Sequence, residues 1–136
     1  MTIVLDANIS VDWFSSQSSK LADAALDAVG HEGAIVPALW RWEVQDVVRR
    51  LAFDNRLKMS PAEAMAALRA LPIEIDRDLT GLFGTEFALA SDHRLSVYDA
   101  AYLELAVRLN IRLATGDKKL AAAARAEGLA FSEPRR

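Results

Sequence analysis

Four acidic residues of this chain lie at the boundaries between apolar segments and the polar residues that separate them. They are Asp6, Glu43, Asp99 and Asp117. Asp6 and Asp117 each follow a short apolar run, whereas Glu43 and Asp99 lie near the starts of amphipathic segments. Carboxylates gathered at one place repel one another unless a hard divalent cation lies between them, and Mg²⁺ and Mn²⁺ favour such all-oxygen ligand sets. The pattern therefore first indicates a metal-dependent enzyme.

The segments that must position these acids alternate between strand and helix periodicity along the chain. Short apolar runs predict strands at 3–5, 34–36, 73–75 and 112–114, and a candidate fifth at 129–131. Helical spacing predicts helices over 18–29, 38–53, 61–71, 79–90, 96–109 and 118–127. Between the first strand and the first of these helices, Asp6-Ala7-Asn8 is interpreted as a turn or a helix cap. Ser60-Pro61-Ala62-Glu63 has the residues of a capping box, with Pro at the first helical position.

Strands interleaved with helices predict an α/β fold with a mainly parallel sheet covered by helices on both faces. In such folds, strand exits and helix starts lie at one edge of the sheet, where sites are built. Glu43 and Asp99 each fall at the boundary between the apolar and polar faces of their helices. We therefore expect the four carboxylates to converge across one groove.

Composition sets wider bounds on the protein. The 136 residues are expected to form one domain over 1–132 with a short tail at 133–136, and no apolar stretch approaches the roughly 20 residues of a membrane span. The chain has no cysteine and begins directly with a predicted strand, which favours a cytoplasmic protein. The formal charge is −3, but four of the negative charges are those of the predicted site. Arg41, Lys118 and Lys119 remain either solvated helix residues or a surface for phosphates.

Each acid also has a simpler structural explanation. Asp6 and Asp117 are favourable helix caps, Ser96-Val97-Tyr98-Asp99 matches a capping box, and Glu43 suits a helix surface. Capping does not explain why Glu43 and Asp99 both flank apolar faces. Taken together, the four positions favour a shared site over four independent caps.

The same four positions, in this order, resemble the PIN-domain proteins, and more narrowly the VapC-type toxins of prokaryotic toxin–antitoxin pairs. The contexts are Val4-Leu5-Asp6-Ala7-Asn8, Trp42-Glu43-Val44, Tyr98-Asp99-Ala100-Ala101-Tyr102 and Thr115-Gly116-Asp117-Lys118-Lys119. The resemblance extends from about residue 3 to residue 131. It implies a three-layer α/β/α sandwich and an endoribonuclease that depends on Mg²⁺ or Mn²⁺. It also implies a homodimer that a small cognate antitoxin holds inactive.

Position by position, the resemblance implies that Asp6, Glu43, Asp99 and Asp117 are the acidic catalytic residues, with Asp6, Asp99 and Asp117 as metal ligands. Thr115 would orient the last acid or a bound water, and Asn8 would hydrogen-bond within the site. Asp6 and Asp99 are the best direct ligands, whereas Asp117 and Glu43 remain open as direct ligands, ligands through water, or a base. Arg41, Lys118 and Lys119 are candidates for RNA binding. Asp46 departs from the family, since relatives often carry Asn there.

Other classes of protein fit less well. A haloacid-dehalogenase-like phosphotransferase needs a second Asp where this chain has Asn8, and a receiver domain needs an acceptor Asp after a central strand. The alternative that remains is a catalytically inactive PIN-like module that binds RNA or protein. Trp42 is the tryptophan that helical spacing makes most exposed, and it is therefore the candidate for base stacking.

Two segments offer more apolar surface than one small sheet covers. They are the segment 79–90 and the apolar stripe of Trp40, Val44, Val47, Val48 and Leu51. The sequence therefore predicts a symmetric homodimer.

Overall fold

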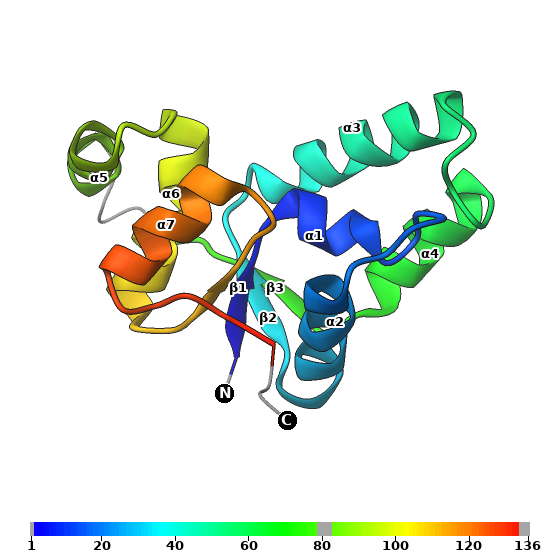
Figure 1. Cartoon of the computed structure of the whole chain (residues 1–136), viewed down its shortest axis with the longest axis horizontal. Coiled ribbons are helices and arrows are strands. Elements are labelled where there is room, and N and C mark those ends of the chain that lie inside the picture. Colours follow the sequence, from blue (N-terminus) through cyan, green and yellow to red (C-terminus); the bar gives the residue numbers. More distant parts are fainter. Residues whose placement is uncertain (1, 79–82, 134–136) are drawn as a thin grey trace.

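A four-stranded parallel sheet forms the centre of the molecule in the computed structural model, which describes residues 2–78 and 83–133 (Figure 1). The strands are β1 (Ile3–Leu5), β2 (Ala34–Val36), β3 (Ile73–Ile75) and β4 (Leu113–Ala114). Their order across the sheet is β3-β2-β1-β4, and every neighbouring pair is parallel. The predicted parallel sheet is thus confirmed, with four strands in the described part of the chain.

The candidate fifth strand at 129–131 is wrong as an extended strand. It contributes one parallel bridge, between Leu113 and Ala130. Two backbone hydrogen bonds hold it, from Leu113 N–H to the Leu129 carbonyl at 2.8 Å and from Phe131 N–H to the Leu113 carbonyl at 3.0 Å. Because β4 is itself only two residues long, it offers no further ladder positions for a fifth strand.

Helices cover both faces of the sheet, which gives the three-layer α/β/α sandwich (Figure 1). The lobe on the right of Figure 1 contains α1 (Ala7–Asp12), α2 (Lys20–Glu32), α3 (Trp40–Phe53) and α4 (Pro61–Ala70). The lobe on the left contains α5 (Thr85–His93), α6 (Val97–Leu109) and α7 (Lys118–Ala126). No helix of the described residues is both long enough and apolar enough to cross a membrane.

Two segments differ only in part from the prediction. In Asp6-Ala7-Asn8, interpreted as a turn or a helix cap, Asp6 does occupy the N-cap of a helix, the short α1, which the sequence did not predict. The helix predicted over 79–90 begins, in the described residues, only at Thr85 and continues to His93, where Arg94 ends it in a left-handed conformation with φ 55°. Residues 79–82 of that prediction and 134–136 of the predicted tail lie outside the described residues.

Local chemistry explains the remaining helix ends. Ser60 and Glu63 form the predicted capping box at α4, and Pro61 occupies the first turn. Gly33 ends α2 with φ 80°, and a Cβ added there would lie 3.1 Å from the Pro72 carbonyl oxygen. That close approach lets Ala34 N–H donate to the same oxygen, so the glycine helps β2 to pair with β3.

The middle of helix α6 is enclosed. Seven consecutive residues, 100–106, are buried, and most are apolar on every side of the helix, as expected for a helix packed between a sheet and other helices. Alanines at 100, 101 and 106 allow close packing against these neighbours. Asp99 therefore projects from a helix with little freedom to move.

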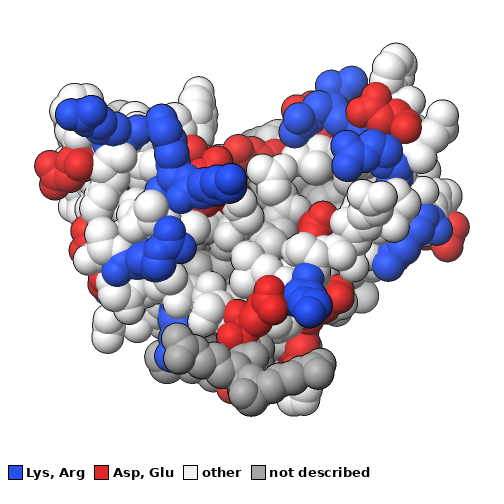
Figure 2. Space-filling model, in the orientation of Figure 1, with Lys and Arg blue, Asp and Glu red and all other residues white. Residues whose placement is uncertain are grey.

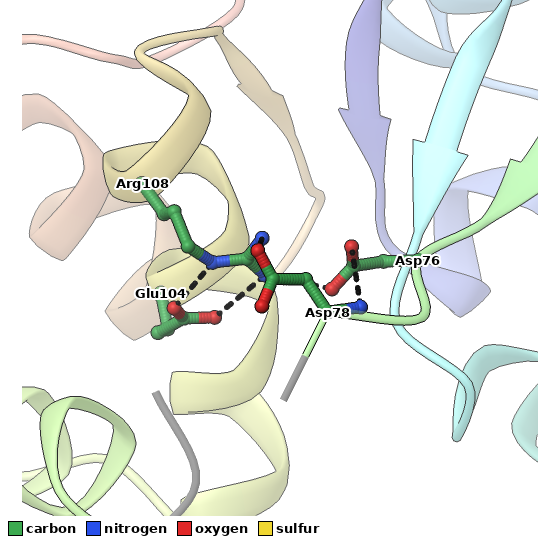
Figure 3. A network of polar contacts seen from close by, with 4 residues as sticks. All are labelled: Asp76, Asp78, Glu104 and Arg108. Carbon is green, nitrogen blue, oxygen red and sulfur yellow. Dashed lines mark hydrogen bonds and ion pairs between the residues drawn. The ribbon is translucent and has the colours of Figure 1, made fainter. Parts of the chain in front are cut away.

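An ion-pair network ties the far end of α6 to the segment after β3 (Figure 3). Arg108 donates to Glu104 at 2.8 Å, to Asp76 at 2.6 Å and to Asp78 at 3.3 Å. The Glu104 side chain is only 7% exposed, so its charge depends on Arg108 for compensation. The network fixes the last turn of α6 to the segment that follows β3.

Candidate metal centre

The strand order creates a switch point between β1 and β4. From β1 the chain moves to β2 and β3 on one side, and then returns to β4 on the other side of β1. Crevices at such points, beyond the carboxyl ends of parallel strands, are where open α/β sheets bind ligands. Asp6 directly follows β1, and its N–H donates to the Ala114 carbonyl of β4 at 3.0 Å. Asp6 and Thr115 therefore leave the sheet side by side.

Asp6 is a buried carboxylate, with only 5% of its surface exposed. Its Oδ2 accepts a hydrogen bond of 2.7 Å from the Thr115 hydroxyl. Burial raises the pKa of Asp6 to about 6; the Thr115 hydrogen bond opposes this rise, and the charges of Glu43 and Asp99 add to it. Its side chain makes no capping hydrogen bond to α1, so the capping explanation does not account for this acid.

Thr115 links Asp6 to Asp117. While its hydroxyl donates to Asp6, the same oxygen accepts the Asp117 N–H at 3.0 Å. Asp117 is the N-cap of α7, where its Oδ1 accepts the Leu120 N–H at 2.9 Å. The capping explanation is therefore correct for Asp117, and it coexists with a place in the acidic cluster.

Glu43 enters the cluster from the first turn of α3 and makes a hydrogen bond that no local sequence pattern indicates. Its Oε1 accepts a hydrogen bond of 2.5 Å from the hydroxyl of Tyr102 on α6. Burial raises the pKa of Glu43; the Tyr102 hydrogen bond opposes the rise, and the charge of Asp99 adds to it. In the sequence, Tyr102 marks only an apolar face. A phenol at a buried helix position nevertheless needs a polar partner, and that was the available signal.

Asp99 occupies the first turn of α6, where its N–H donates to the Ser96 hydroxyl at 3.1 Å. Burial raises the pKa of Asp99, and the neighbouring charge of Asp117 raises it further. The pKa of Asp6 is raised by Glu43 and by Asp99, and that of Glu43 by Asp99. Each of the four acids therefore lies within electrostatic reach of at least one other. Glu43 and Asp99 are half-buried, in accord with their boundary positions on the helices.

The four acids have the donor chemistry of a hard-cation site, but their side chains do not form a ready-made cage. No three acidic, histidine or cysteine side chains within 2–78 and 83–133 are arranged to hold a metal ion. Three of the carboxylates are held by hydrogen bonds to Thr115, Tyr102 and the Leu120 N–H. The oxygen donors and their mutual repulsion suit Mg²⁺ or Mn²⁺. Binding would require the aspartate side chains to turn toward a shared ion.

The supporting residues surround this cluster. Exposed Asn8 lines a cavity together with Asp117 and Gly116. Lys118 and Lys119 are exposed in the first turn of α7, directly after Asp117. Figure 2 shows acidic side chains in the notch between the two lobes and basic side chains on its flanks.

Arg41 and Asp46 lie on α3 near Glu43 but make other contacts. The guanidinium carbon of Arg41 lies 4.2 Å from the centre of the Trp42 ring, and Trp42 is 57% exposed. Asp46 is exposed and pairs with Arg49 at 3.1 Å and with Arg50 at 3.8 Å on the same helix. The extra acid at position 46 is thus engaged by arginines of its own helix.

The fold and site define a parallel α/β/α protein with a carboxylate cluster at the switch point of its sheet. The PIN domain family model matches residues 3–126, and the chain belongs to that family. It is 39% identical over 88 residues to Ribonuclease VapC1 of Mycobacterium tuberculosis, in strains CDC 1551 / Oshkosh and ATCC 25618 / H37Rv. The match covers 64% of this chain and 65% of the relative, just under two thirds of its length.

Two solved structures share the fold. The crystal structure of PAE2754 from Pyrobaculum aerophilum superposes with a TM-score of 0.65 at 18% identity, over 90% of this chain and 84% of the other. FitAcB from Neisseria gonorrhoeae superposes with a TM-score of 0.57 at 20% identity, over 91% of this chain and 94% of the other. Both confirm the fold class predicted from the sequence.

Proposed function

We propose that the protein is a metal-dependent endoribonuclease, the toxin of a type II toxin–antitoxin pair, which acts in the cytoplasm. The observation that carries the proposal is the cluster of Asp6, Glu43, Asp99 and Asp117 at the switch point, where burial and mutual repulsion raise the pKa of three of them. Membership of the PIN domain family and the similarity to Ribonuclease VapC1 support the same activity.

Asp6, Asp99 and Asp117 would hold the divalent cation, with Glu43 as a direct ligand, a ligand through water, or a base. A bound Mg²⁺ or Mn²⁺ supplies a water of lowered pKa and neutralises charge that builds on the phosphoryl oxygens. The Thr115 hydroxyl orients Asp6 by donating to Oδ2, and it fixes the Asp117 backbone by accepting its N–H. Asn8 lies beside Asp117, where its amide would hydrogen-bond to the substrate or to a water.

The basic residues that flank the cluster support an RNA substrate. Lys118 and Lys119 are exposed in the first turn of α7, directly after the Asp117 carboxylate that caps this helix. Two exposed cations beside the carboxylate cluster would attract the phosphates of an RNA backbone. Arg41, two residues before Glu43, would contact the backbone from the α3 side of the groove.

A small antitoxin would inhibit the enzyme by occupying the acidic groove. An Arg in its tail would pair with the carboxylates in a bidentate manner and exclude the cation. A cognate basic peptide is therefore expected to bind more weakly at saturating Mn²⁺ than in its absence. Equal affinity in both conditions would place the inhibitory contact elsewhere.

The proposed activity is tested by incubating purified protein with RNA in Mg²⁺, in Mn²⁺ and in EDTA. We expect cleavage with either metal, none with EDTA, and none with Asp6→Asn or Asp99→Asn. Circular dichroism of each variant would show that the fold is retained. Cleavage by Asp99→Asn at the wild-type rate would overturn the assignment.

The alternative is an inactive PIN-like module that binds RNA or protein. Retention of all four acids in one electrostatic cluster favours the enzyme. The two are separated by metal binding, because an inactive relative would neither bind Mn²⁺ at the cluster nor cleave RNA.

A further inference from the structure

Tyr102 combines complete burial with a polar contact to the site. Its relative exposure is 0%, and it lies one helical turn after Asp99 on α6. Its hydroxyl donates to Glu43 Oε1 at 2.5 Å, across 59 residues of sequence. This distance lies at the short end of the range for hydroxyl-to-carboxylate bonds, which are among the stronger hydrogen bonds in proteins.

The bond connects the two lobes that border the acidic cluster. Glu43 belongs to α3 in the right lobe of Figure 1, and Tyr102 belongs to α6 in the left lobe. The glutamate side chain has three rotatable bonds and is half-buried, so it could otherwise adopt several orientations. The tyrosine has two, and its ring is enclosed by the core. The rigid Tyr102 therefore determines where the flexible Glu43 side chain points.

The Glu43–Tyr102 pair also fixes the relation between two acids. Asp99 and Tyr102 lie one turn apart on the same side of α6, so a carboxylate held by Tyr102 has a set position relative to Asp99. With Oε1 engaged by the phenol, Oε2 is the Glu43 oxygen left to face a ligand. Partners of this kind, which orient a metal-binding side chain, strongly affect metal affinity.

We propose that Tyr102 is a positioning residue that holds Glu43 in the orientation required by the divalent cation of the proposed nuclease, on which this role depends. If the hydroxyl bonded to Glu43 only because a buried hydroxyl needs a hydrogen-bond acceptor, its removal would affect folding stability alone. A positioning tyrosine affects Mn²⁺ affinity, and does so through Glu43.

The test measures Mn²⁺ binding without RNA, by calorimetry and by the electron paramagnetic resonance signal of free Mn²⁺. Tyr102→Phe removes only the hydroxyl, and Tyr98→Phe makes the same change on the same helix at a side chain that is 70% exposed. We expect Tyr102→Phe to bind Mn²⁺ about 10-fold more weakly. Tyr98→Phe is expected to bind as the wild type does. In a Glu43→Gln background, Tyr102→Phe should produce no further loss.

Two results would overturn the role of Tyr102 alone. One is Tyr102→Phe protein that binds Mn²⁺ as well as the wild type or more tightly. The other is an equal loss in the Glu43→Gln background, which would show that Tyr102 does not act through Glu43. Wild-type protein that binds no Mn²⁺, or an Asp6→Asn variant with unchanged affinity, would instead overturn the proposed function and this role with it.

If Tyr102→Phe does not fold, Glu43→Asp replaces it. The carboxylate is then one methylene shorter and cannot reach the phenol, while its charge is kept. Positioning by Tyr102 predicts weakened Mn²⁺ binding for this variant also, and unchanged affinity would contradict it.

Discussion

Asp6 is the residue at which stability and the proposed activity conflict most directly. A carboxylate with 5% exposure, near two other acids, is held there by one hydroxyl donor and the surrounding fold. Ionising it in this environment costs free energy, which is why its pKa rises. A divalent cation would bind this ionised form, so only a bound cation would offset the free energy of ionising Asp6.

The stability of metal-free protein should therefore depend on the ionisation of Asp6. Because the pKa rises from 3.8 when unfolded to about 6 when folded, the neutral form stabilises the native state below pH 3.8, and this contribution is lost as pH rises through about 6. Asp6→Asn cannot ionise and so does not lose this stability. As pH rises from 3.8 through about 6, the unfolding free energy of the variant should increasingly exceed that of the wild type, by up to about 3 kcal/mol. Urea unfolding in EDTA at several pH values measures the difference. Parallel curves for the two proteins would contradict the prediction.

At this scale the sequence predicted where the four acids lie better than it predicted which side chains hold them. The four acids and the boundary positions of Glu43 and Asp99 follow from strand ends and helical spacing, and the family resemblance adds Thr115. Tyr102 could not be assigned, because its partner is 59 residues away and no local pattern marks the pair. The charge of Asp46, which departs from the family, is engaged by arginines within the next helical turn, and the sequence alone could not decide this.

Helix α6 shows how an element can carry a site residue in a fixed position. Its first turn presents Asp99, its middle is buried on all sides, and its last turn is held by Arg108. Glu104 and Asp76 are both largely buried partners of that arginine, with 7% and 15% of their side chains exposed. A buried charge that loses its partner is strongly destabilising, whereas an exposed pair contributes little.

Arg108→Met should consequently destabilise the protein by about 3–5 kcal/mol, because it leaves Glu104 buried without its cation. Arg49→Met is the matched control: its pair with Asp46 is 74% and 59% exposed, so the loss should stay below about 1 kcal/mol. Guanidinium unfolding of both variants measures the contrast. Equal effects of the two substitutions would show that the network does not anchor α6.

The first turn of α7 carries a separate prediction about substrate binding. Replacing Lys118 and Lys119 by Ala should weaken RNA binding and reduce the dependence of affinity on salt, by about 0.7 in the logarithmic slope for each phosphate that the variant no longer neutralises. Lys58→Ala, at an exposed position between α3 and α4, is the control. Affinities measured over a range of salt concentrations, in EDTA to prevent cleavage, give the slopes. An unchanged slope would remove these lysines from the RNA surface.

The sequence predicted the boundaries of helices correctly where side chains cap them. Its predictions failed where tertiary contacts determine the length of a helix or strand. The Ser60 capping box, with Pro61 in its first turn, is local chemistry and was predictable. Helix α1 was not, because six residues give too few apolar positions to show a helical period. The predicted strand at 129–131 is limited to a bridge by the short partner β4, which the apolar pattern could not reveal.

For the whole molecule, the structure retains one of the two surfaces on which the expected dimer was based and removes the other. The stripe on α3 that suggested surplus apolar surface packs against the protein's own core: Trp40, Val44 and Val48 are at most 6% exposed. The prediction that this stripe would be surplus is wrong, because α1 covers it and Trp40 donates to Ser10 at 2.8 Å. The other segment named in that prediction, 79–90, does expose large apolar side chains in its described part, where Phe83 is 91% and Phe87 66% exposed.

A homodimer remains a proposal, now with α5 as the expected contact. Light scattering at micromolar concentration should give twice the chain mass of 14.9 kDa. Phe87→Glu should give a monomer, because a charge in an apolar interface opposes association. Phe53→Glu, at an exposed apolar residue at the end of α3, should remain dimeric. A monomeric wild-type protein would refute the assembly, and a dimeric Phe87→Glu variant would refute this contact surface.

The central claim is that four carboxylates at the switch point of the sheet form one divalent-cation site. Anomalous diffraction from a crystal grown or soaked with Mn²⁺ tests this claim most directly. We expect an anomalous peak among Asp6, Asp99 and Asp117, with Glu43 facing it in the orientation that the hydrogen bond from Tyr102 sets. A fully occupied Mn²⁺ peak elsewhere, with these carboxylates in their present orientations, would contradict the claim.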